Sequence, residues 1–424
     1  MGPAARRRWL PVAAGAILAL FVGGCSSNHT GHGTAAVGVA GSPASASPSP
    51  STRAPALAAV LKTTPANGAQ AVNPTSPITV TVANGTLTAV KLTNDEGKVV
   101  QGTLSADKRS WKAGEVLGYS KPYTLTASGV SGDRKTVTTT SKFRTLTPGN
   151  MTMPYIDTAA GYAISPGGTY GVGQAIRVAF DEPIANKAAA EKALKVTTNP
   201  PQQGAWNWFD DQNVHWRPKN YFLAHTKVTV SANLYGVEVG PGLYGQADAS
   251  VSFKIGDAQI SKVNDADKVI NVYSNGKLVK QMPTSMGKGG YVSGTQGQSI
   301  SLWTNSGPHI VIGKEHDFKM NSNSYGLSSR SPEGYADIFI KWGVKVSVDG
   351  EYVHWAPWSV WAQGHQDTSH GCLNISPENS EWFYNFSQPG DIVDVEGTPQ
   401  KLQIWNSGDW LVPWATWVRG SAVH

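Results

Sequence analysis

Short runs that alternate apolar and polar residues fill the chain from about residue 58 to about residue 255. One stretch reads PITVTVANGTLTAVKLTNDEGKVVQGTL, with Asn-Gly and Glu-Gly pairs between its alternating runs. A period of two gives a β-strand one buried and one exposed face, and such pairs mark turns between strands. This part of the chain is therefore expected to fold into antiparallel sheets that pack face to face.

The same plan occurs twice along the chain. The runs AIRVAF, KVTVSANLYG and ASVSFKIGD of the second half repeat the pattern of the first. Trp111 precedes YTLTASG by about twelve residues, and Trp216 precedes VTVSANL by a similar distance. We predict two tandem Ig-like β-sandwiches, at 58–148 and 149–254, with one short helix capped by Asn186 in the second. Neither sandwich has a converging set of titratable groups, which favours a spacer role over an enzymatic one.

A third block, 255–398, opens with KVINVYSNGKLVKQMPTSMG, which predicts a hairpin with its turn at Ser-Asn-Gly. HIVIG, VKVSV and EYVHWAP supply further strands, and a short helix is expected after Pro377. The closing segment, 399–424, is rich in tryptophan. For this segment, packing against the body of the protein is favoured over a ligand site; its tryptophans are Trp405, Trp410, Trp414 and Trp417.

The N-terminus has the features of an export signal. Three arginines precede an apolar run from Leu10 to Val22, which has the length of a signal-peptide core and is short for a membrane span. The run leads to Gly-Gly-Cys25, which resembles a bacterial lipobox whose cysteine is lipidated; an ordinary signal peptide with an incidental cysteine is the alternative. We expect a lipoprotein signal peptide at 1–24, a Ser-, Pro- and Ala-rich linker at 25–57, and an extracytoplasmic protein anchored to the membrane by lipid.

The charge of the chain argues against nucleic acid as a partner. The 35 Lys and Arg residues exceed the 29 Asp and Glu residues by 6, and loss of the three arginines of the signal peptide leaves +3. No basic run with interleaved aromatic residues accompanies this mild excess.

Cys372 is the only cysteine besides Cys25, so lipidation of Cys25 leaves it without a partner for an intramolecular disulfide. A single cysteine near histidines is typical of a nucleophile, and its polar neighbours disfavour a buried structural role. A zinc site made by His365, His370 and Cys372 is the rival chemistry, but no Cys-x-x-Cys or His-Glu-x-x-His pattern supports it.

The residues around Cys372 provide what a thiol nucleophile needs. A free thiol is mostly protonated at neutral pH, and His354 and His370 are the candidate bases. Gly371 permits a tight turn and leaves backbone amides open as an oxyanion hole, and Asn374 can hold the turn or a substrate amide.

The motif SHGCLN, with His354 upstream, resembles the signature of the L,D-transpeptidase (YkuD-like) catalytic domain. LTPGNMTMPYI, AAAEKALKVTTNPP, VKQMPTSMGK and APWSVWAQGH extend the likeness over about 58–424, to mycobacterial members with two N-terminal Ig-like domains. The resemblance implies a mainly β chain in which two tandem Ig-like sandwiches precede a YkuD-like mixed β-sandwich catalytic domain, with the Trp-rich extension at the C-terminus. It also implies a substrate in the cell wall.

The resemblance also implies roles for individual residues. Cys372 would be the nucleophile, His354 its general base and His370 a supporting group. The backbone carbonyl of Trp355 would complete the triad at a position where close relatives usually have Ser, and the bulk of this side chain bears on the shape of the groove. The implied oxyanion and substrate-binding residues are Tyr335, Gly371, Asn374, Met320, Tyr325, Trp358, Asp349 and Gly350. Three of them lie in MNSNSYGLSSRSPEGY, whose length and composition favour a lid over simple loop packing.

From this resemblance we expect an acyltransferase that forms 3→3 peptidoglycan cross-links through a cysteine thioester, with release of D-Ala from a donor tetrapeptide stem. The expected partners are donor and acceptor stem peptides, carbapenem β-lactams as covalent inhibitors, and the membrane. No cofactor is expected, since the thioester chemistry needs none. A calcium site like that of some relatives is not carried over, because the corresponding turn offers one carboxylate, Glu238. An L,D-carboxypeptidase and a non-catalytic wall-binding lipoprotein are the alternatives.

Overall fold

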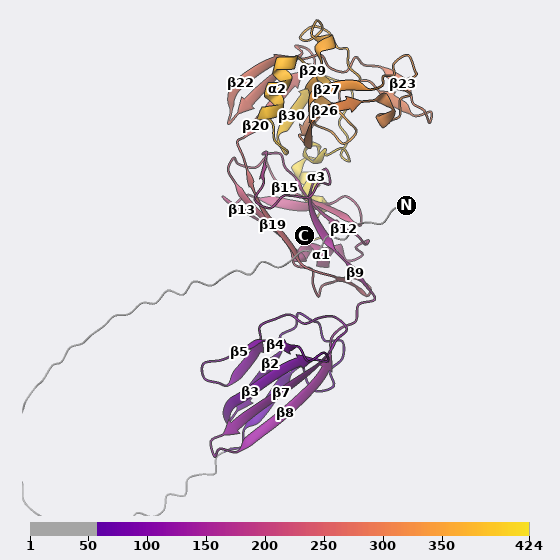
Figure 1. The fold of residues 1–424 in the computed structure, drawn as a ribbon. Helices are drawn as coiled ribbons and strands as arrows, with labels where there is room; N and C mark the ends of the chain where they lie inside the picture. Colours follow the sequence, from indigo (N-terminus) through magenta and orange to yellow (C-terminus); the bar gives the residue numbers. More distant parts are fainter. Residues whose placement is uncertain (1–56, 424) are drawn as a thin grey trace, which may run out of the picture. The chain divides into compact units, whose positions relative to one another are not determined.

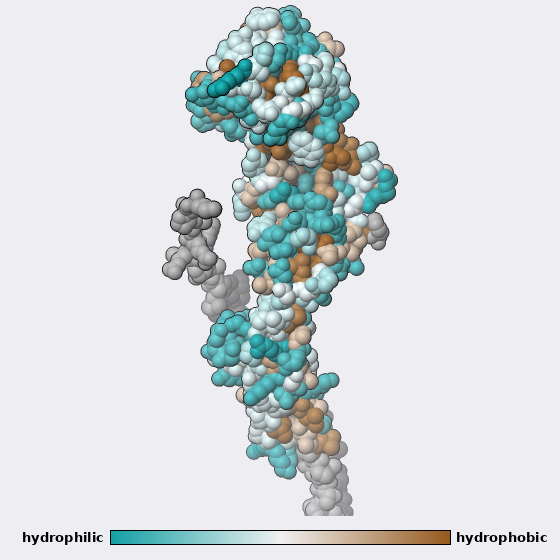
Figure 2. Space-filling model, turned by 90° about the vertical axis from the view of Figure 1, so that its right-hand side faces the viewer, coloured by the Kyte–Doolittle hydropathy of each residue, from teal (hydrophilic) through white to brown (hydrophobic). Residues whose placement is uncertain are grey.

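The computed structural model describes residues 57–423 and is built mainly of β-strands, as predicted (Figure 1). The expected signal peptide, Cys25 and almost all of the expected linker lie outside these residues. Within 57–423, no helix is both long and apolar enough to cross a bilayer. On the face drawn in Figure 2, apolar side chains form separate patches between hydrophilic ones.

The first sandwich consists of two four-stranded sheets with their own core. Alternate residues of β7 (Pro122–Ser131) are buried along its whole length, as the period of two requires. One sheet has the order β1 (Val60–Thr64), β2 (Thr79–Ala83), β6 (Ser110–Ala113), β5 (Gly102–Leu104); the other has β4 (Val99–Val100), β3 (Gly85–Asn94), β7, β8 (Thr136–Arg144). Trp111 is buried in the core between them.

The second sandwich repeats this plan and contains the expected helix. Asn186 caps α1 (Lys187–Ala193) by accepting the N–H of Ala189 at 3.0 Å. Its sheets are β10 (Pro154–Thr158), β12 (Ile176–Phe180), β15 (Asn213–Pro218), β14 (Gly204–Trp208), and β11 (Thr169–Tyr170), β19 (Ala249–Ile255), β16 (Lys227–Ala232), β13 (Leu194–Asn199). A smaller sheet joins β17 (Glu238–Gly240), β18 (Leu243–Gly245) and β9 (Asn150–Thr152).

The third part is a mixed sandwich of a five-stranded and a four-stranded sheet. The predicted hairpin is confirmed, with Asn275 and Gly276 at φ 49° and 79° in its turn. The five-stranded sheet runs β22 (Lys277–Pro283), β21 (Val269–Ser274), β20 (Gln259–Asn264), β30 (Ile392–Glu396), β25 (Gly307–Ile310). The other runs β26 (Gly313–Met320), β27 (Ile338–Lys345), β28 (Tyr352–Trp355), β29 (Leu373–Ile375), and β23 (Tyr291–Ser293) pairs with β24 (Ser299–Ser301).

The core of this third part lies between its two sheets. Val272 from one sheet and Val353 from the other are buried together with Phe383 of α2 (Pro377–Phe386). Ser376 caps α2 by accepting the N–H of Asn379, and Pro377 occupies its first turn, where its missing N–H costs nothing.

The second sandwich shares its core with the third part, so the interpretation of both sandwiches as spacers is incomplete. Ile310 of β25 and Ile392 of β30 belong to the hydrophobic cluster of the second sandwich. The N–H groups of Gly171 and Gly173 donate to the carbonyls of Pro389 and Gly390 at 2.8 and 2.9 Å. Backbone hydrogen bonds and two apolar side chains therefore connect the second sandwich to the third part.

The C-terminal segment packs on the second sandwich through three of its tryptophans. The Arg217 guanidinium lies over the rings of Trp410, Trp414 and Trp417 (α3, Trp414–Trp417), with distances of 4.6, 5.6 and 4.5 Å to their centroids. Trp405 differs from the expectation, because it is 65% exposed and lines the pocket described below.

Candidate active site

A pocket of about 490 Å³ in the third part contains Cys372. All eleven residues that the sequence assigned to catalysis and substrate binding line this one pocket: Met320, Tyr325, Tyr335, Asp349, Gly350, His354, Trp358, His370, Gly371, Cys372 and Asn374. They come from three separate stretches of the chain, 320–335, 349–358 and 370–374. Their proximity in space is a property of the fold, and their individual roles belong to the proposal below.

Parallel pairing of β28 with β29 brings the histidine and the cysteine together. His354 is paired with Asn374, two residues after Cys372, so that both side chains reach the same end of the sheet. Cys372 lies in the turn before β29, where Gly371 has a φ of 131°. The Ser369 hydroxyl braces this turn, since it accepts the N–H of Gly371 at 3.1 Å and donates to the Cys372 carbonyl at 2.6 Å.

His354 is oriented to act as a base. It is 3% exposed, and its Nδ1 lies 2.8 Å from the carbonyl oxygen of Trp355. A carbonyl oxygen can only accept, so Nδ1 carries the hydrogen and Nε2 keeps its lone pair for a proton. Burial lowers the pKa of His354 to about 4, which keeps the imidazole neutral at physiological pH.

The side chain of Trp355 lies away from the pocket lining. Its ring packs between Phe339 and Trp358, with centroid distances of 6.0 and 5.8 Å. Only its backbone carbonyl takes part in the arrangement around His354.

Cys372 is a protonated thiol in the resting protein. Burial raises its pKa to about 12, and the nearby carboxylates of Glu351 and Asp349 add to the rise. Among the described residues, Sγ has its hydrogen-bond contact with the Gly350 carbonyl, at 3.9 Å. A neutral thiol beside a neutral imidazole requires the proton to move to His354 as the sulfur attacks.

This pair of pKa values predicts the pH dependence of acylation. We expect the rate of adduct formation with a carbapenem to be constant through neutral pH and to fall in acid, near pH 4, as His354 becomes protonated. Rapid mixing with mass detection across pH measures this. His354→Gln should lower the rate by about 100-fold and remove the acid limb. A rate that rises with thiolate formation near the ordinary thiol pKa, or a greater loss in His370→Gln, would contradict this assignment.

The segment 320–335, which the sequence predicts to be a lid, contributes two tyrosines, Tyr325 and Tyr335, to the pocket lining. Ser322 ties its ends together, because its hydroxyl donates to the carbonyl of Tyr335 at 3.0 Å and accepts the N–H of the same residue at 3.1 Å. Burial raises the pKa of Tyr325 to about 12, and burial also raises that of Tyr335. Both phenols therefore keep their hydrogens at neutral pH and can donate to a developing oxyanion.

His370 belongs to the lid contact. Its ring centroid lies 5.3 Å from that of Tyr335, and its Nε2 lies 3.7 Å from the carboxylate of Glu333. Lys288 pairs with the same carboxylate. Burial and the charge of Lys288 lower the pKa of His370, which favours a neutral ring packed against Tyr335.

Asn374 fixes the wall next to His354. Its side chain is 3% exposed and donates to the hydroxyl of Ser359 at 3.1 Å. Ser359 ends the short 3₁₀ turn η2 (Pro357–Ser359), which carries Trp358. Asn374 therefore braces the turn that carries Trp358. Its suggested roles at the nucleophile turn or toward a substrate amide stay predictions.

Several lining residues were missed in the sequence, among them Trp303, Asn305, Glu351, Gln400 and Trp405. Glu351 lies three residues before His354 in the run EYVHWAP, and this proximity could have indicated that it lines the same pocket. The others come from loops whose contact with the motif depends on tertiary structure. No group of three or more His, Cys, Asp or Glu side chains within residues 57–423 is arranged to hold a metal ion, and His365 is not among the lining residues.

Comparison with known proteins gives a consistent assignment. Residues 69–238 match a bacterial Ig domain model, and residues 258–395 match the L,D-transpeptidase catalytic domain (YkuD) model. L,D-transpeptidase 2 of Mycobacterium tuberculosis (strain CDC 1551) is 42% identical over 84% of this chain and 83% of its own length. L,D-transpeptidase 5 of the H37Rv strain is 38% identical over 85% of this chain and 76% of its own length.

A solved structure, L,D-transpeptidase 3 from Mycobacterium tuberculosis in complex with a faropenem-derived adduct, is 30% identical, with a TM-score of 0.43 over 55% of this chain and 95% of that one. The sequence relatives span most of both chains, and the catalytic-domain model covers the segment that contains Cys372 and His354. This chain belongs to the L,D-transpeptidase family.

Proposed function

We propose that this chain forms 3→3 peptidoglycan cross-links through a thioester on Cys372. The observation that carries the proposal is the pairing of β28 with β29, which places the thiol and an imidazole with a free Nε2 in one pocket. The family assignment supports a transferase that acts on stem peptides.

In the first step, Sγ attacks the carbonyl carbon between the third residue of the donor stem and its terminal D-Ala. The thiol proton passes to Nε2 of His354 and then to the departing amine of D-Ala. The C–N bond breaks, the C–S bond forms, and the thioester remains. Backbone amides at Gly371 and the phenols of Tyr335 and Tyr325 are the donors available to the transient oxyanion.

In the second step, the side-chain amine of an acceptor stem attacks the thioester carbonyl. The C–S bond breaks, the new C–N bond forms, and Cys372 regains its thiol. Two easier acyl transfers, from amide to thioester and from thioester to amide, thus replace one direct amide exchange. A carbapenem presents a strained amide to the same sulfur, and we propose that it traps the enzyme as a stable adduct.

Defined muropeptides test the proposal. Incubation with a disaccharide-tetrapeptide should release D-Ala and yield a dimer joined between the third residues of two stems, and intact mass should show an acyl adduct of the ectodomain. Release of D-Ala without the dimer would identify a carboxypeptidase. Unchanged substrate and unmodified protein would refute the enzymatic function.

We further propose that Cys25 carries a lipid that holds the enzyme at the outer face of the cell membrane, facing the wall. Cys25→Ser should then move the protein from the detergent phase to the aqueous phase, because two or more acyl chains on Cys25 supply the stable membrane anchor. Partitioning of fractionated cells, with wild type as control, measures this. Wild type that already resides in the aqueous phase would refute the anchor.

A further inference from the structure

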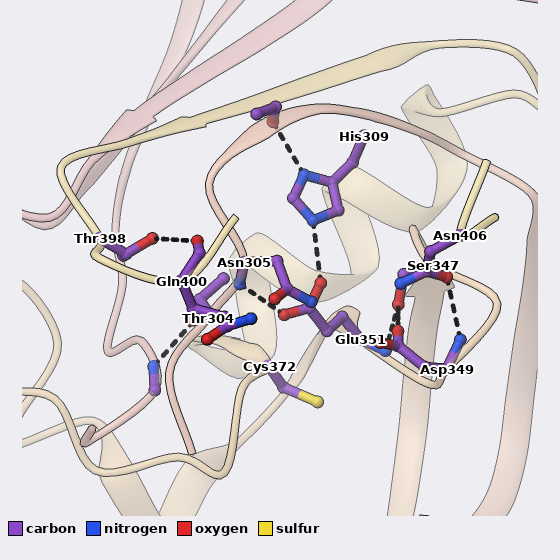
Figure 3. A network of polar contacts seen from close by, with 12 residues as sticks. Thr304, Asn305, His309, Ser347, Asp349, Glu351, Cys372, Thr398, Gln400 and Asn406 are labelled. Atoms are coloured by element: carbon purple, nitrogen blue, oxygen red, sulfur yellow. Dashed lines mark hydrogen bonds and ion pairs between the residues drawn. The ribbon is translucent and has the colours of Figure 1, made fainter. Parts of the chain in front are cut away.

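A buried histidine–glutamate pair stands beside Cys372 and has no part in the steps above. His309 of β25 is fully buried, and its Nε2 lies 2.9 Å from Oε2 of Glu351. The other oxygen of Glu351 accepts the N–H of Asn305 at 2.7 Å. Figure 3 shows Glu351 between the His309 ring and Cys372. Two hydrogen bonds therefore hold the Glu351 carboxylate in a defined position in the pocket wall.

Hydrogen bonds on both ring nitrogens fix the orientation of the His309–Glu351 pair. Nδ1 of His309 lies 2.9 Å from the carbonyl oxygen of Gly307, so both ring nitrogens face oxygen acceptors. Burial opposes a charge on His309, but the carboxylate of Glu351 outweighs it and raises the pKa of His309. Burial also raises the pKa of the Glu351 carboxyl, and the bonds from His309 and the Asn305 N–H oppose that rise. These two bonds orient the pair with the histidine behind and the carboxylate at the pocket.

The carboxylate lies close to the nucleophile turn. A Cβ placed on Gly371 would lie 3.7 Å from Oε1 of Glu351, one residue from Cys372. Glu351 lines the pocket, whereas His309 does not. Each carboxylate oxygen has a second lone pair, so Glu351 can accept a further hydrogen bond from a ligand while it keeps both present partners.

The charges of the pocket lining are of one sign. Of the described residues that line it, Asp349 and Glu351 are acidic, and none is Lys or Arg. His354 adds no positive charge, because its low pKa keeps it neutral. A cationic group is the ligand that this side of the pocket favours.

We propose that Glu351, held in place by His309 and the Asn305 N–H, receives the protonated side-chain amine of the acceptor stem and so directs the thioester toward aminolysis rather than hydrolysis. This inference rests on the proposed function and names the group that selects its second substrate. His309 is a positioning residue, because it acts through Glu351.

The chemical step balances without any further reactant. The ammonium held at Glu351 gives one proton to solvent, and the resulting amine attacks the thioester carbonyl. Its second proton passes through Nε2 of His354 to the departing sulfur. A C–N bond forms, the C–S bond breaks, and Cys372 regains its thiol.

The test compares two nucleophiles on a preformed acyl-enzyme. The thioester is first made with a donor stem and verified by intact mass. It is then treated with an acceptor peptide bearing a protonated side-chain amine, or with hydroxylamine, which is mainly uncharged at neutral pH. Glu351→Gln is the key variant, since its amide can still accept from Asn305 and donate to His309. Glu351→Asp retains the charge, and Glu315→Gln removes a carboxylate outside the pocket.

We expect Glu351→Gln to slow aminolysis by the cationic acceptor about tenfold, and to change the hydroxylamine rate by less than about twofold. Glu351→Asp should lie between Glu351→Gln and wild type, and Glu315→Gln should match wild type. Equal losses for both nucleophiles, or no loss for the cationic one, would overturn the assignment. Wild type that forms the thioester but shows no preference for the ammonium also overturns it and leaves the proposed function intact; wild type that forms no thioester overturns both.

Discussion

Cys372→Ala is expected to form no covalent adduct with a carbapenem or a donor stem, and to retain at most a few per cent of wild-type cross-linking. The reason is chemical, because the acyl group has no other atom to occupy once the sulfur is removed. The side chain is small, so its loss should leave the thermal unfolding midpoint close to that of wild type. Intact mass after incubation with excess carbapenem, together with muropeptide analysis, measures both parts.

Cys372→Ser is the matched control for this variant. Serine is of similar size and keeps a polar hydrogen, but it replaces the thiol with an alcohol. His354 can deprotonate the alcohol only at a much greater free-energy cost. We expect at most a slow adduct in Cys372→Ser and none in Cys372→Ala. An adduct of Cys372→Ala that maps to another residue would remove Cys372 from the mechanism.

Local patterns in the sequence were sufficient for the strands and turns. The hairpin at Asn275-Gly276 could be predicted because both positions need a positive φ, which few other residue pairs adopt readily. The helix after Asn186 could be predicted from its cap and from its Ala-rich composition. In both cases the information lies within a few neighbouring residues.

The pocket could be predicted only as far as the family resemblance extends. The motif and its likeness placed eleven residues in one pocket, but they gave no sign that His309 would meet Glu351 across 42 residues of chain. That contact requires β25 to pair with β30 and the loop at Asn305 to reach the turn before β28, and short-range periodicity does not specify such pairings.

Trp405 is a residue for which the sequence predicted a tertiary contact that the structure does not contain. Its composition-based assignment to core packing holds for Trp417, which is fully buried, but Trp405 is on the exposed part of the segment. Spacing along an irregular tail does not indicate which ring faces the body of the protein, because the tail has no single period. Because one ring is buried and the other exposed, substitutions of Trp417 and Trp405 can test how much the packing of the tail stabilises the fold.

The C-terminal tail links two parts of the structure that the sequence treats as independent. The Asp409 carboxylate lies 2.7 Å from Nδ1 of His215 on β15, and both residues are buried. Asn406 accepts the N–H groups of Val348 and Asp349, which lead to Gly350 and the pocket. The tail thus rests on the second sandwich and braces the turn beside Cys372.

We therefore expect residues 149–424 to fold and to be acylated like residues 57–424, whereas residues 255–424 should fail to give a cooperative unfolding transition. Without the second sandwich, Trp417, Ile310 and Ile392 would lose their packing partners, and uncovering one large core side chain costs about 3–5 kcal/mol against a typical total of about 5–15 kcal/mol. Thermal unfolding and the rate of carbapenem acylation, compared among residues 57–424, 149–424 and 255–424, measure this.

Two single substitutions in the tail separate this packing effect from other effects of truncation. Trp417→Ala removes a ring that is 0% exposed and whose Nε1 donates to the Ala205 carbonyl at 2.8 Å, so it should cost about 3–5 kcal/mol of unfolding free energy. Trp405→Ala removes a ring of equal size that is 65% exposed and should change the unfolding free energy by less than about 1 kcal/mol. If residues 255–424 fold cooperatively and are acylated at the full rate, or if the two tryptophan variants are equally stable, the second sandwich is a spacer after all. A loss confined to Trp417→Ala would mean that the second sandwich and the tail together form the platform on which the pocket is built.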